Sequence, residues 1–254
     1  MRQNTEYLER YAVGIWSKFK GSEAWHSLKR FTFLRSGYHL GIELVRVWGE
    51  EKGSAIDYFE THFRSGTDPW NYETSTMEQE RFAKQTELLD DARDGKRFNF
   101  GLEIGCAEGL YTEVIAERCN TLQVLDLSPT ALDRARGRRQ WPSSVRFDRF
   151  DVRRDAIPGT FDLIVIAGVL EYFSNPTTFH RIRTNLCSAL RPGGILLIET
   201  TRVTPVVENA WWARYLIKGR WINDFMSRTP ELIEISSAST EEYVITLLRK
   251  QGKG

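Results

Sequence analysis

The 254-residue chain has few cysteines, no long apolar run and almost no net charge. Its three cysteines, Cys106, Cys119 and Cys187, are scattered, which fits neither a disulfide framework nor a zinc cluster. No apolar stretch is long enough to span a bilayer, and the polar start MRQNTEYLER does not read as a signal peptide. We therefore expect a cytoplasmic protein with no membrane partner.

The charges nearly cancel, with 35 Lys and Arg against 34 Asp and Glu and a formal net charge of +1. This balance argues against nucleic acid bound through bulk electrostatics. Hydrophobic residues make up 41% and charged residues 27%, an ordinary globular composition. The length is sufficient for one large α/β domain with an appendage.

Residues 1–96 show helical patterns rich in aromatic side chains and no convincing buried strand. Apolar residues recur at helical spacing over 7–15, 38–53 and 74–89. A turn-rich stretch, SGTDPW at 65–70, precedes the last of these. We predict that residues 1–96 form a helical cap, which acts as a lid or as a homodimer contact.

Residues 97–254 alternate apolar runs with helical segments, the pattern of a parallel sheet covered on both faces. Two final strands follow each other without a long helix between them. The sequence predicts an α/β, Rossmann-like, seven-stranded sheet that is mostly parallel with its last strand antiparallel. The expected strands are 100–104, 122–125, 145–150, 161–166, 194–199, 232–236 and 243–249, and the expected helices are 110–119, 129–140 and 176–190.

The first strand runs into a glycine-rich turn, LEIGCAEG at 102–109. Gly105 and Gly109 let the backbone approach a ligand closely, although a purely structural turn is the alternative. Glu103 would repel a pyrophosphate and suits a cation, such as the ammonium and sulfonium groups of S-adenosylmethionine. Ala107 replaces the middle glycine of the common G-x-G-x-G form. The turn therefore favours S-adenosylmethionine over a dinucleotide.

Acidic residues also follow the next two expected strands. Asp126 can bind both hydroxyls of a ribose, although a helix cap is an equally good interpretation. Asp151 can accept the adenine amino group while Val152 donates its backbone N–H, with Asp148 as a competing candidate. The fourth strand ends at Ala167 and is followed by the segment AGVLEYF.

This series of motifs resembles the class I S-adenosylmethionine-dependent methyltransferases over residues 98–249. The resemblance implies that the first turn binds the methionine part, that Asp126 binds the ribose with Leu127 beside the adenine, and that the end of the fourth strand lines the cofactor. The cofactor-binding residues predicted from it are Glu103, Gly105, Cys106, Ala107, Gly109, Asp126, Leu127, Asp151, Val152 and Ala167.

The segment TDPWNYETSTMEQERFAKQTELL, followed by EIGCAEGLYTEVIAERC, is similar to the NodS-like methyltransferases, which methylate the free amine of a chitooligosaccharide. In that group the aromatic segment before the first strand folds over the cofactor. The similarity implies that Trp70, Tyr72 and Arg81 form part of a lid. The chain departs from the group at Gly168, where a glutamate is usual, and this departure puts an acceptor contact in doubt.

Three residues are candidates for acid–base chemistry. Glu171 and Tyr172 follow the fourth strand, and His62 precedes the predicted lid; ordinary packing is the alternative for each. No Asp/Asp/Asn trio follows the fourth strand, so we expect no metal. The aromatic residues Trp211, Trp212, Tyr215 and Trp221 either stack on an acceptor or pack against the domain.

The sequence therefore predicts an S-adenosylmethionine-dependent methyltransferase that acts on a small molecule, on an amino or hydroxyl group of a sugar or another metabolite. A protein that binds S-adenosylmethionine without catalysis remains an alternative, since Ala107 replaces a glycine and no base is obvious. A nicotinamide-dependent oxidoreductase is a weaker alternative, because it should contain G-x-G-x-x-G and lack Glu103.

Overall fold

The computed structural model describes residues 55–173, 175–202, 220–240 and 242–252. The chain divides into two compact units, Met1–Val45 and Arg46–Gly254, and the described residues all belong to the second. The expected helices at 7–15 and 38–53 and the aromatic residues Trp211, Trp212 and Tyr215 lie outside the described residues. The division into a cap at 1–96 and a domain at 97–254 stays a prediction.

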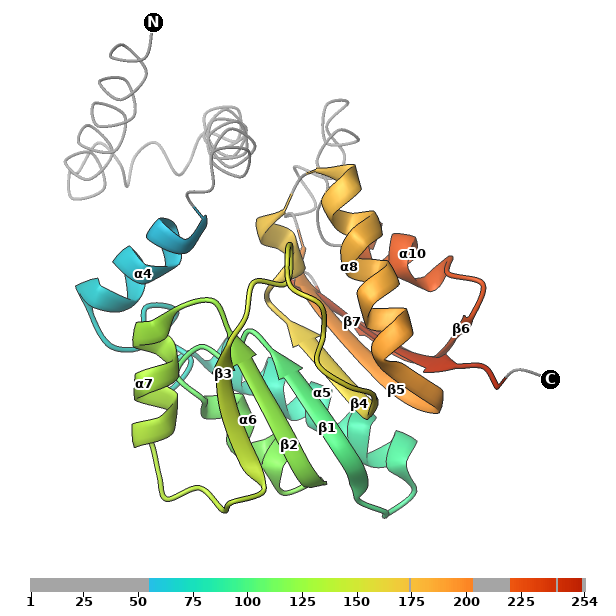
Figure 1. Cartoon of the computed structure of the whole chain (residues 1–254), viewed down its shortest axis with the longest axis horizontal. Coiled ribbons are helices and arrows are strands. Elements are labelled where there is room, and N and C mark those ends of the chain that lie inside the picture. Colours follow the sequence, from blue (N-terminus) through green and yellow to red (C-terminus); the bar gives the residue numbers. More distant parts are fainter. Residues whose placement is uncertain (1–54, 174, 203–219, 241, 253–254) are drawn as a thin grey trace, which may run out of the picture. The chain divides into compact units, whose positions relative to one another are not determined.

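Seven strands form one sheet in the order β3-β2-β1-β4-β5-β7-β6. Strand β7 pairs antiparallel with both β5 and β6, and the other pairs are parallel. The predicted sheet with an antiparallel last strand is confirmed, and β7 lies between β5 and the edge strand β6 (Figure 1). The strands are β1 Phe98–Ile104, β2 Cys119–Asp126, β3 Val145–Arg149, β4 Phe161–Ala167, β5 Leu190–Thr201, β6 Leu232–Ser239 and β7 Tyr243–Lys250.

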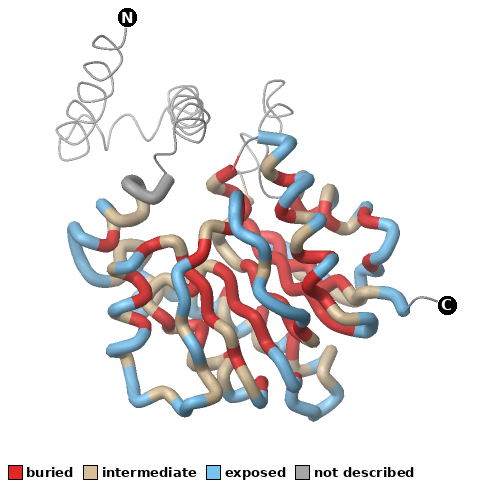
Figure 2. Tube along the Cα trace, in the orientation of Figure 1, coloured by how far each residue is buried: buried red, intermediate tan, exposed pale blue. Residues whose placement is uncertain are grey.

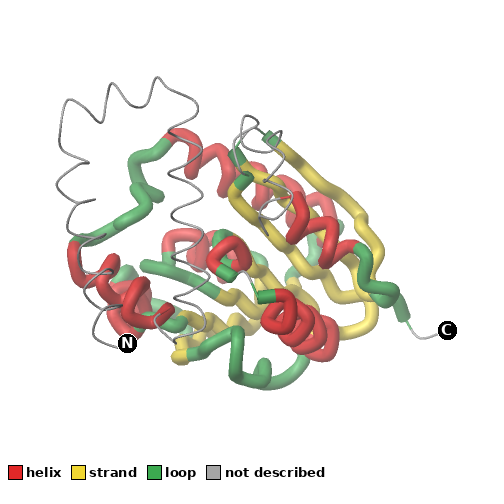
Figure 3. The backbone as a smooth tube through the Cα atoms, turned by 90° about the horizontal axis from the view of Figure 1, so that it is seen from above, coloured by secondary structure: helices red, strands yellow, loops and turns green. Residues whose placement is uncertain are grey.

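Helices cover both faces of the sheet (Figure 3). Three of them begin at side-chain caps, where Ser75, Ser128 and Asn175 each accept a hydrogen bond from a backbone N–H of the first turn. The helices are α4 Ala55–Ser65, α5 Thr76–Arg93, α6 Leu110–Ala116, α7 Pro129–Gly137, the 3₁₀ turn η1 Leu170–Tyr172, α8 Pro176–Ala189 and α10 Arg220–Ser227. No helix in these described ranges is both long and apolar enough to cross a membrane.

The sheet separates two apolar cores because alternate side chains of each strand point to opposite faces. Helices α8 and α10 pack on the face that carries Leu102, Ile104 and Ile198. Helices α5, α6 and α7 pack on the face that carries Val165 and Leu197. The central strands are buried along most of their length, as Figure 2 shows. Glu103 and Glu199 alternate with residues of the α8 face, so both carboxylates point into the α5 layer.

The Pro-Gly-Gly sequence at 192–194 is typical of a turn and predicts a fifth strand that begins only at residue 194, and this prediction is wrong. Strand β5 begins at Leu190, directly after α8, and the Pro-Gly-Gly sequence lies within it. Its pairing with β4 shifts register between Phe161 and Leu163, so the extra residues form a bulge. Gly193 adopts a φ of +79°, which a glycine tolerates. The strand therefore accommodates residues that usually mark a turn.

Candidate active site

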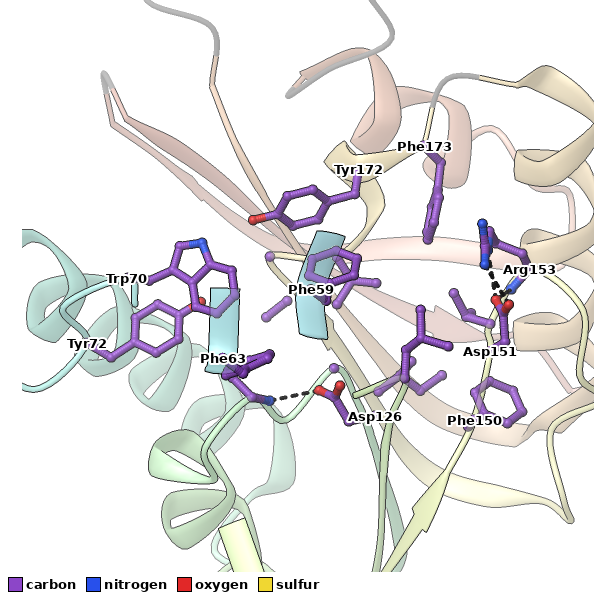
Figure 4. A pocket seen from close by; sticks show the side chains of 18 residues that line it. Phe59, Phe63, Trp70, Tyr72, Asp126, Phe150, Asp151, Arg153, Tyr172 and Phe173 are labelled. Atoms are coloured by element: carbon purple, nitrogen blue, oxygen red, sulfur yellow. Dashed lines mark hydrogen bonds and ion pairs between the residues drawn. The ribbon is translucent and has the colours of Figure 1, made fainter. Parts of the chain in front are cut away.

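A cavity with about 670 Å³ of empty space, open solvent included, lies at the carboxyl ends of β1, β2, β3 and β4. Its walls come from the turns after these strands, from α4 and the loop that follows, and from η1 (Figure 4). A second, more polar space of about 380 Å³ adjoins it and shares Tyr72, Gly105, Ala107 and Ala167 with it. Ligand sites in open α/β sheets lie at this edge of the sheet.

The turn after β1 requires a left-handed backbone at three positions. Gly105 has a φ of +84°, and a Cβ there would lie 2.2 Å from Cγ2 of Val169. Ala107 adopts a φ of +49° despite its side chain, at a cost of about 1–2 kcal/mol. Gly109 has a φ of +82° and caps α6, but it lies against Ala135 and does not line either cavity. Of these three left-handed positions, only Gly105 and Ala107 therefore line the cavities.

Glu103 lines the smaller space and is 4% exposed. Its Oε2 accepts a hydrogen bond of 2.6 Å from Thr112 Oγ1. Burial raises the pKa of Glu103 to about 8, against the opposing effect of the Thr112 hydrogen bond, and the nearby Asp126 raises it further. A cation in this space would relieve the desolvation of the carboxylate.

Asp126 joins the turns after β1 and β2. Its two carboxylate oxygens accept backbone N–H groups of Ala107 and Ser128, each at 2.9 Å. Burial raises its pKa to about 6, and these hydrogen bonds oppose the increase. The helix cap is Ser128 and not Asp126, so the alternative interpretation of Asp126 as a cap is wrong. Asp126 lines the larger cavity together with Leu127.

Asp151 lines the same cavity two residues beyond the end of β3. Arg153, which the sequence analysis missed, grips its carboxylate with Nε at 2.9 Å and Nη2 at 2.7 Å. Burial raises the pKa of Asp151, but the Arg153 hydrogen bonds outweigh it and the net pKa is lowered. The competing Asp148 is exposed, is bonded by Gln123 and does not line the cavity.

Aromatic rings form the wall opposite Asp151 and Arg153 (Figure 4). Phe59 meets Tyr172 edge-on with ring centroids 4.8 Å apart, and Trp70 stacks on Tyr72 at 6.0 Å. Phe63 of α4 completes this wall. Phe59 and Phe63 are not among the residues predicted from the sequence, although their spacing of four residues places them on one face of α4.

Three carboxylates link this aromatic segment to the turns before α6 and α7 and to the end of α7. Ser128 Oγ donates to Glu60 at 2.6 Å, the Asp68 backbone N–H donates to Glu108 at 3.0 Å, and Arg138 pairs with Glu73 at 2.9 Å. Arg134 pairs with Glu108 at 2.6 Å. These contacts hold the segment at 59–73 against the turns that precede α6 and α7 and against the end of α7.

The predicted site residues are largely brought together. Ten line the larger cavity: Trp70, Tyr72, Gly105, Ala107, Asp126, Leu127, Asp151, Val152, Ala167 and Tyr172. Arg81, Glu103 and Cys106 line the adjoining space. Gly109, His62 and Glu171 line neither. His62 stacks on Trp70 at 6.2 Å, and Glu171 accepts a hydrogen bond of 3.0 Å from Thr201 Oγ1. The roles of all these residues stay predictions.

Within the described ranges, no three His, Cys, Asp or Glu side chains are grouped so that they could hold a metal ion. The three cysteines are free and buried. Burial raises the pKa of the Cys106 thiol, and the carboxylates of Asp126 and Glu103 raise it further. Cys106 therefore lines the smaller space as a neutral thiol.

Relatives in curated collections of proteins match about half of this chain. Nodulation protein S of Bradyrhizobium diazoefficiens is 37% identical over 135 residues, which are 53% of this chain and 63% of that protein. Nodulation protein S of Rhizobium tropici is 36% identical over 135 residues, 53% of this chain and 56% of that protein. The chain thus spans less than two thirds of the length of these relatives.

A solved structure of the same family is similar to this chain. The N-methyltransferase NodS from Bradyrhizobium japonicum WM9, in complex with S-adenosyl-L-homocysteine, superposes with a TM-score of 0.65 at 26% identity. The match covers 78% of this chain and 98% of that one. A family model described as Nodulation protein S (NodS) matches residues 57–214, more than half of this chain. The chain therefore belongs to the NodS family of S-adenosylmethionine-dependent methyltransferases.

Proposed function

We propose that this protein transfers the methyl group of S-adenosylmethionine to the amino group of a small acceptor, an amino sugar in the first instance. The observation that carries the proposal is the grouping of Glu103, Asp126 and Asp151 around two adjoining cavities at one edge of the sheet. The similar NodS structure is that of an N-methyltransferase, which supports an amine over a hydroxyl acceptor.

The residues present fit the cofactor. Glu103 is a buried carboxylate whose pKa is raised by burial, and the cofactor's ammonium would favour its ionised form. The carboxylate of Asp126 faces the larger cavity and would accept the ribose hydroxyls. The turn at Gly105 has no side chain to block close approach. When bound, S-adenosylmethionine supplies a methyl group on a positively charged sulfur.

The aromatic wall would position the acceptor. The rings of Phe59, Trp70 and Tyr172 can stack on the apolar face of a sugar and exclude water from the reacting atoms. Aromatic faces also stabilise cations, including a methylated ammonium product. The cap at residues 1–96 and a homodimer contact through it belong to the same proposal.

Methyl transfer is tested with the full chain, S-adenosylmethionine and paired acceptors. We expect S-adenosylhomocysteine to form with glucosamine or its β-1,4-linked disaccharide, and mass spectrometry to place the added methyl on nitrogen. Glucose and cellobiose serve as matched acceptors without the amine. Methylation of the hydroxyl acceptors alone would assign an O-methyltransferase. The ubiquinone biosynthesis O-methyltransferase of Xanthomonas campestris is a relative of that class, 33% identical over 128 residues. Cofactor binding without turnover of any acceptor would support a binding protein.

Glu60→Gln is expected to weaken binding of S-adenosylmethionine roughly threefold to tenfold, the order of one hydrogen bond. Glu60 accepts from Ser128 and Thr130 and so holds α4 over the turn that carries Asp126. Calorimetric titration measures the affinity. Glu87→Gln is the matched control, because Glu87 lies on the exposed face of α5 and pairs only with Lys84 among the contacts described. Equal affinity in the two variants would contradict the role of α4 as a wall of the cofactor site.

A further inference from the structure

A group of buried acids lies behind the floor of the larger cavity. Glu199, near the end of β5, is fully buried, and its Oε2 pairs with Nη1 of Arg81. Arg81 also donates from Nε to Glu78 at 2.8 Å. The second oxygen of Glu199, Oε1, has no hydrogen-bond partner among the described residues. One oxygen of a fully buried carboxylate is therefore left without a donor.

Glu171, in η1, is a second buried carboxylate with one bonded oxygen and one oxygen that has no partner among the described residues. It is 8% exposed, and its Oε1 accepts from the backbone N–H and the hydroxyl of Thr201, at 3.4 Å and 3.0 Å. Its Oε2 has no hydrogen-bond partner among the described residues. Glu171 also raises the pKa of Glu199 by repulsion, so the two carboxylates lie within electrostatic range of each other.

Among the described residues, Arg81 is the cation that pairs with acids of this group, and its partners are Glu78 and Glu199. Glu171 makes no ion pair within the same ranges. Buried carboxylate oxygens without a donor are unfavourable, and proteins retain them where a ligand or a reaction uses them. A cationic ligand group that donates N–H bonds would provide a donor and an opposite charge for carboxylate oxygens of this kind.

Gly168 connects this group with the cavity. It lines the cavity after β4 and has a φ of +64°. A Cβ on Gly168 would lie 3.7 Å from Nη1 of Arg81 and 3.9 Å from Oε2 of Glu199. Oε2 of Glu199, the oxygen that pairs with Arg81, therefore lies directly behind Gly168, where no side chain separates it from the cavity that Gly168 lines.

We propose that Glu199 and Glu171 bind the ammonium form of the acceptor and take up its proton; this inference rests on the proposed N-methylation. An N–H bond of the ammonium breaks, and its proton passes to a carboxylate oxygen of Glu199. The electron pair left on nitrogen forms the new bond to the methyl carbon, while the carbon–sulfur bond breaks and its electron pair stays on sulfur. Nitrogen thus regains a positive charge, and Arg81 holds Glu199 in place throughout.

The experiment measures how tightly an amine and its hydroxyl counterpart each bind to the complex of the protein with S-adenosylhomocysteine. The full chain is saturated with S-adenosylhomocysteine and titrated calorimetrically with glucosamine or with glucose, which differ at one substituent. We expect the wild-type protein to bind glucosamine at least tenfold more tightly. Glu171→Gln and Glu199→Gln keep the shape and remove the charge, and we expect each to reduce this preference to less than twofold. Glu87→Gln, an exposed change on α5, should keep it.

Two outcomes overturn the inference: no preference for glucosamine in the wild type, or a full preference in a folded Gln variant. If Glu199→Gln fails to fold, Glu171→Gln decides alone, because Glu171 makes no ion pair in the described structure. Failure of the proposed function looks different. It appears as no binding of S-adenosylhomocysteine, or as methylation of hydroxyl acceptors only, in the assay described above.

Discussion

Replacing Arg81 with methionine is expected to lower the free energy of unfolding by about 3–5 kcal/mol at pH 8. Arg81 is 6% exposed and is the ion-pair partner of the fully buried Glu199. Methionine keeps much of the volume of the arginine side chain and removes its charge. The buried carboxylate of Glu199 therefore loses its counter-charge. The Arg81 guanidinium also lies 4.9 Å from the ring centroid of Phe82, a contact that the variant loses.

The loss should depend on pH in a defined direction. Burial raises the pKa of Glu199 to about 7 in the wild type, although Arg81 opposes the increase. Without Arg81 the pKa rises further. Below pH 7 Glu199 is therefore protonated in both folded proteins, and the difference is at its smallest, about 2–3 kcal/mol from the lost contacts of Arg81 with Glu78 and Phe82. Above pH 7 only the wild type ionises, so the difference grows by up to about 1.4 kcal/mol per pH unit until the pKa of the variant is reached.

Urea denaturation at pH 5.5, 7 and 8.5 measures these differences. Arg136→Met is the matched control, since Arg136 and its partner Asp133 have exposed side chains and such pairs contribute about 0–1 kcal/mol. A loss in Arg81→Met that is as small as in the control, or that does not change with pH, would contradict the assigned burial of the ion pair.

The sheet could be predicted because its inner strands are apolar along their whole length. The segment FDLIVIA is buried on both faces and has no other plausible structure than an inner strand. The start of β5 could not be predicted in the same way. Arg191–Gly194 carry turn residues, and only pairing with β4, some thirty residues earlier in the chain, draws them into a bulged strand.

The grouping of the residues proposed to bind the cofactor could be predicted because these residues lie at or just after the ends of strands. Glu103, Asp126 and Asp151 each stand at or next to the carboxyl end of a parallel strand, and such ends meet at one edge. Contacts between distant segments were not predictable. The ion pair of Arg81 and Glu199 joins residues 118 positions apart, and neither has a local pattern that announces its partner. The ion pair of Arg153 and Asp151 depends on the conformation of the loop after β3.

Glu103→Gln is expected to weaken S-adenosylmethionine binding roughly 100-fold at pH 8, equivalent to about 3 kcal/mol. The substitution keeps an acceptor for Thr112 and removes the only charge with which Glu103 could bind the ammonium of the cofactor. Calorimetry at pH 8 gives the affinity. Glu117→Gln is the control, because Glu117 is exposed at the carboxyl end of α6 and lines neither cavity.

The affinity of the wild type should also rise with pH. Burial raises the pKa of Glu103 to about 8 in the free protein, and a bound ammonium would lower that pKa, so binding releases a proton from Glu103. Affinity therefore rises up to tenfold per pH unit between about pH 6.5 and 8. Asp126, whose pKa burial raises to about 6, is ionised over most of this interval. Glu103→Gln should have an affinity that is nearly independent of pH here, because the titrating carboxyl is gone. A wild-type affinity that does not vary with pH, or a variant with the same slope as the wild type, would remove Glu103 from the ammonium site and transfer that role to another carboxylate of the two cavities.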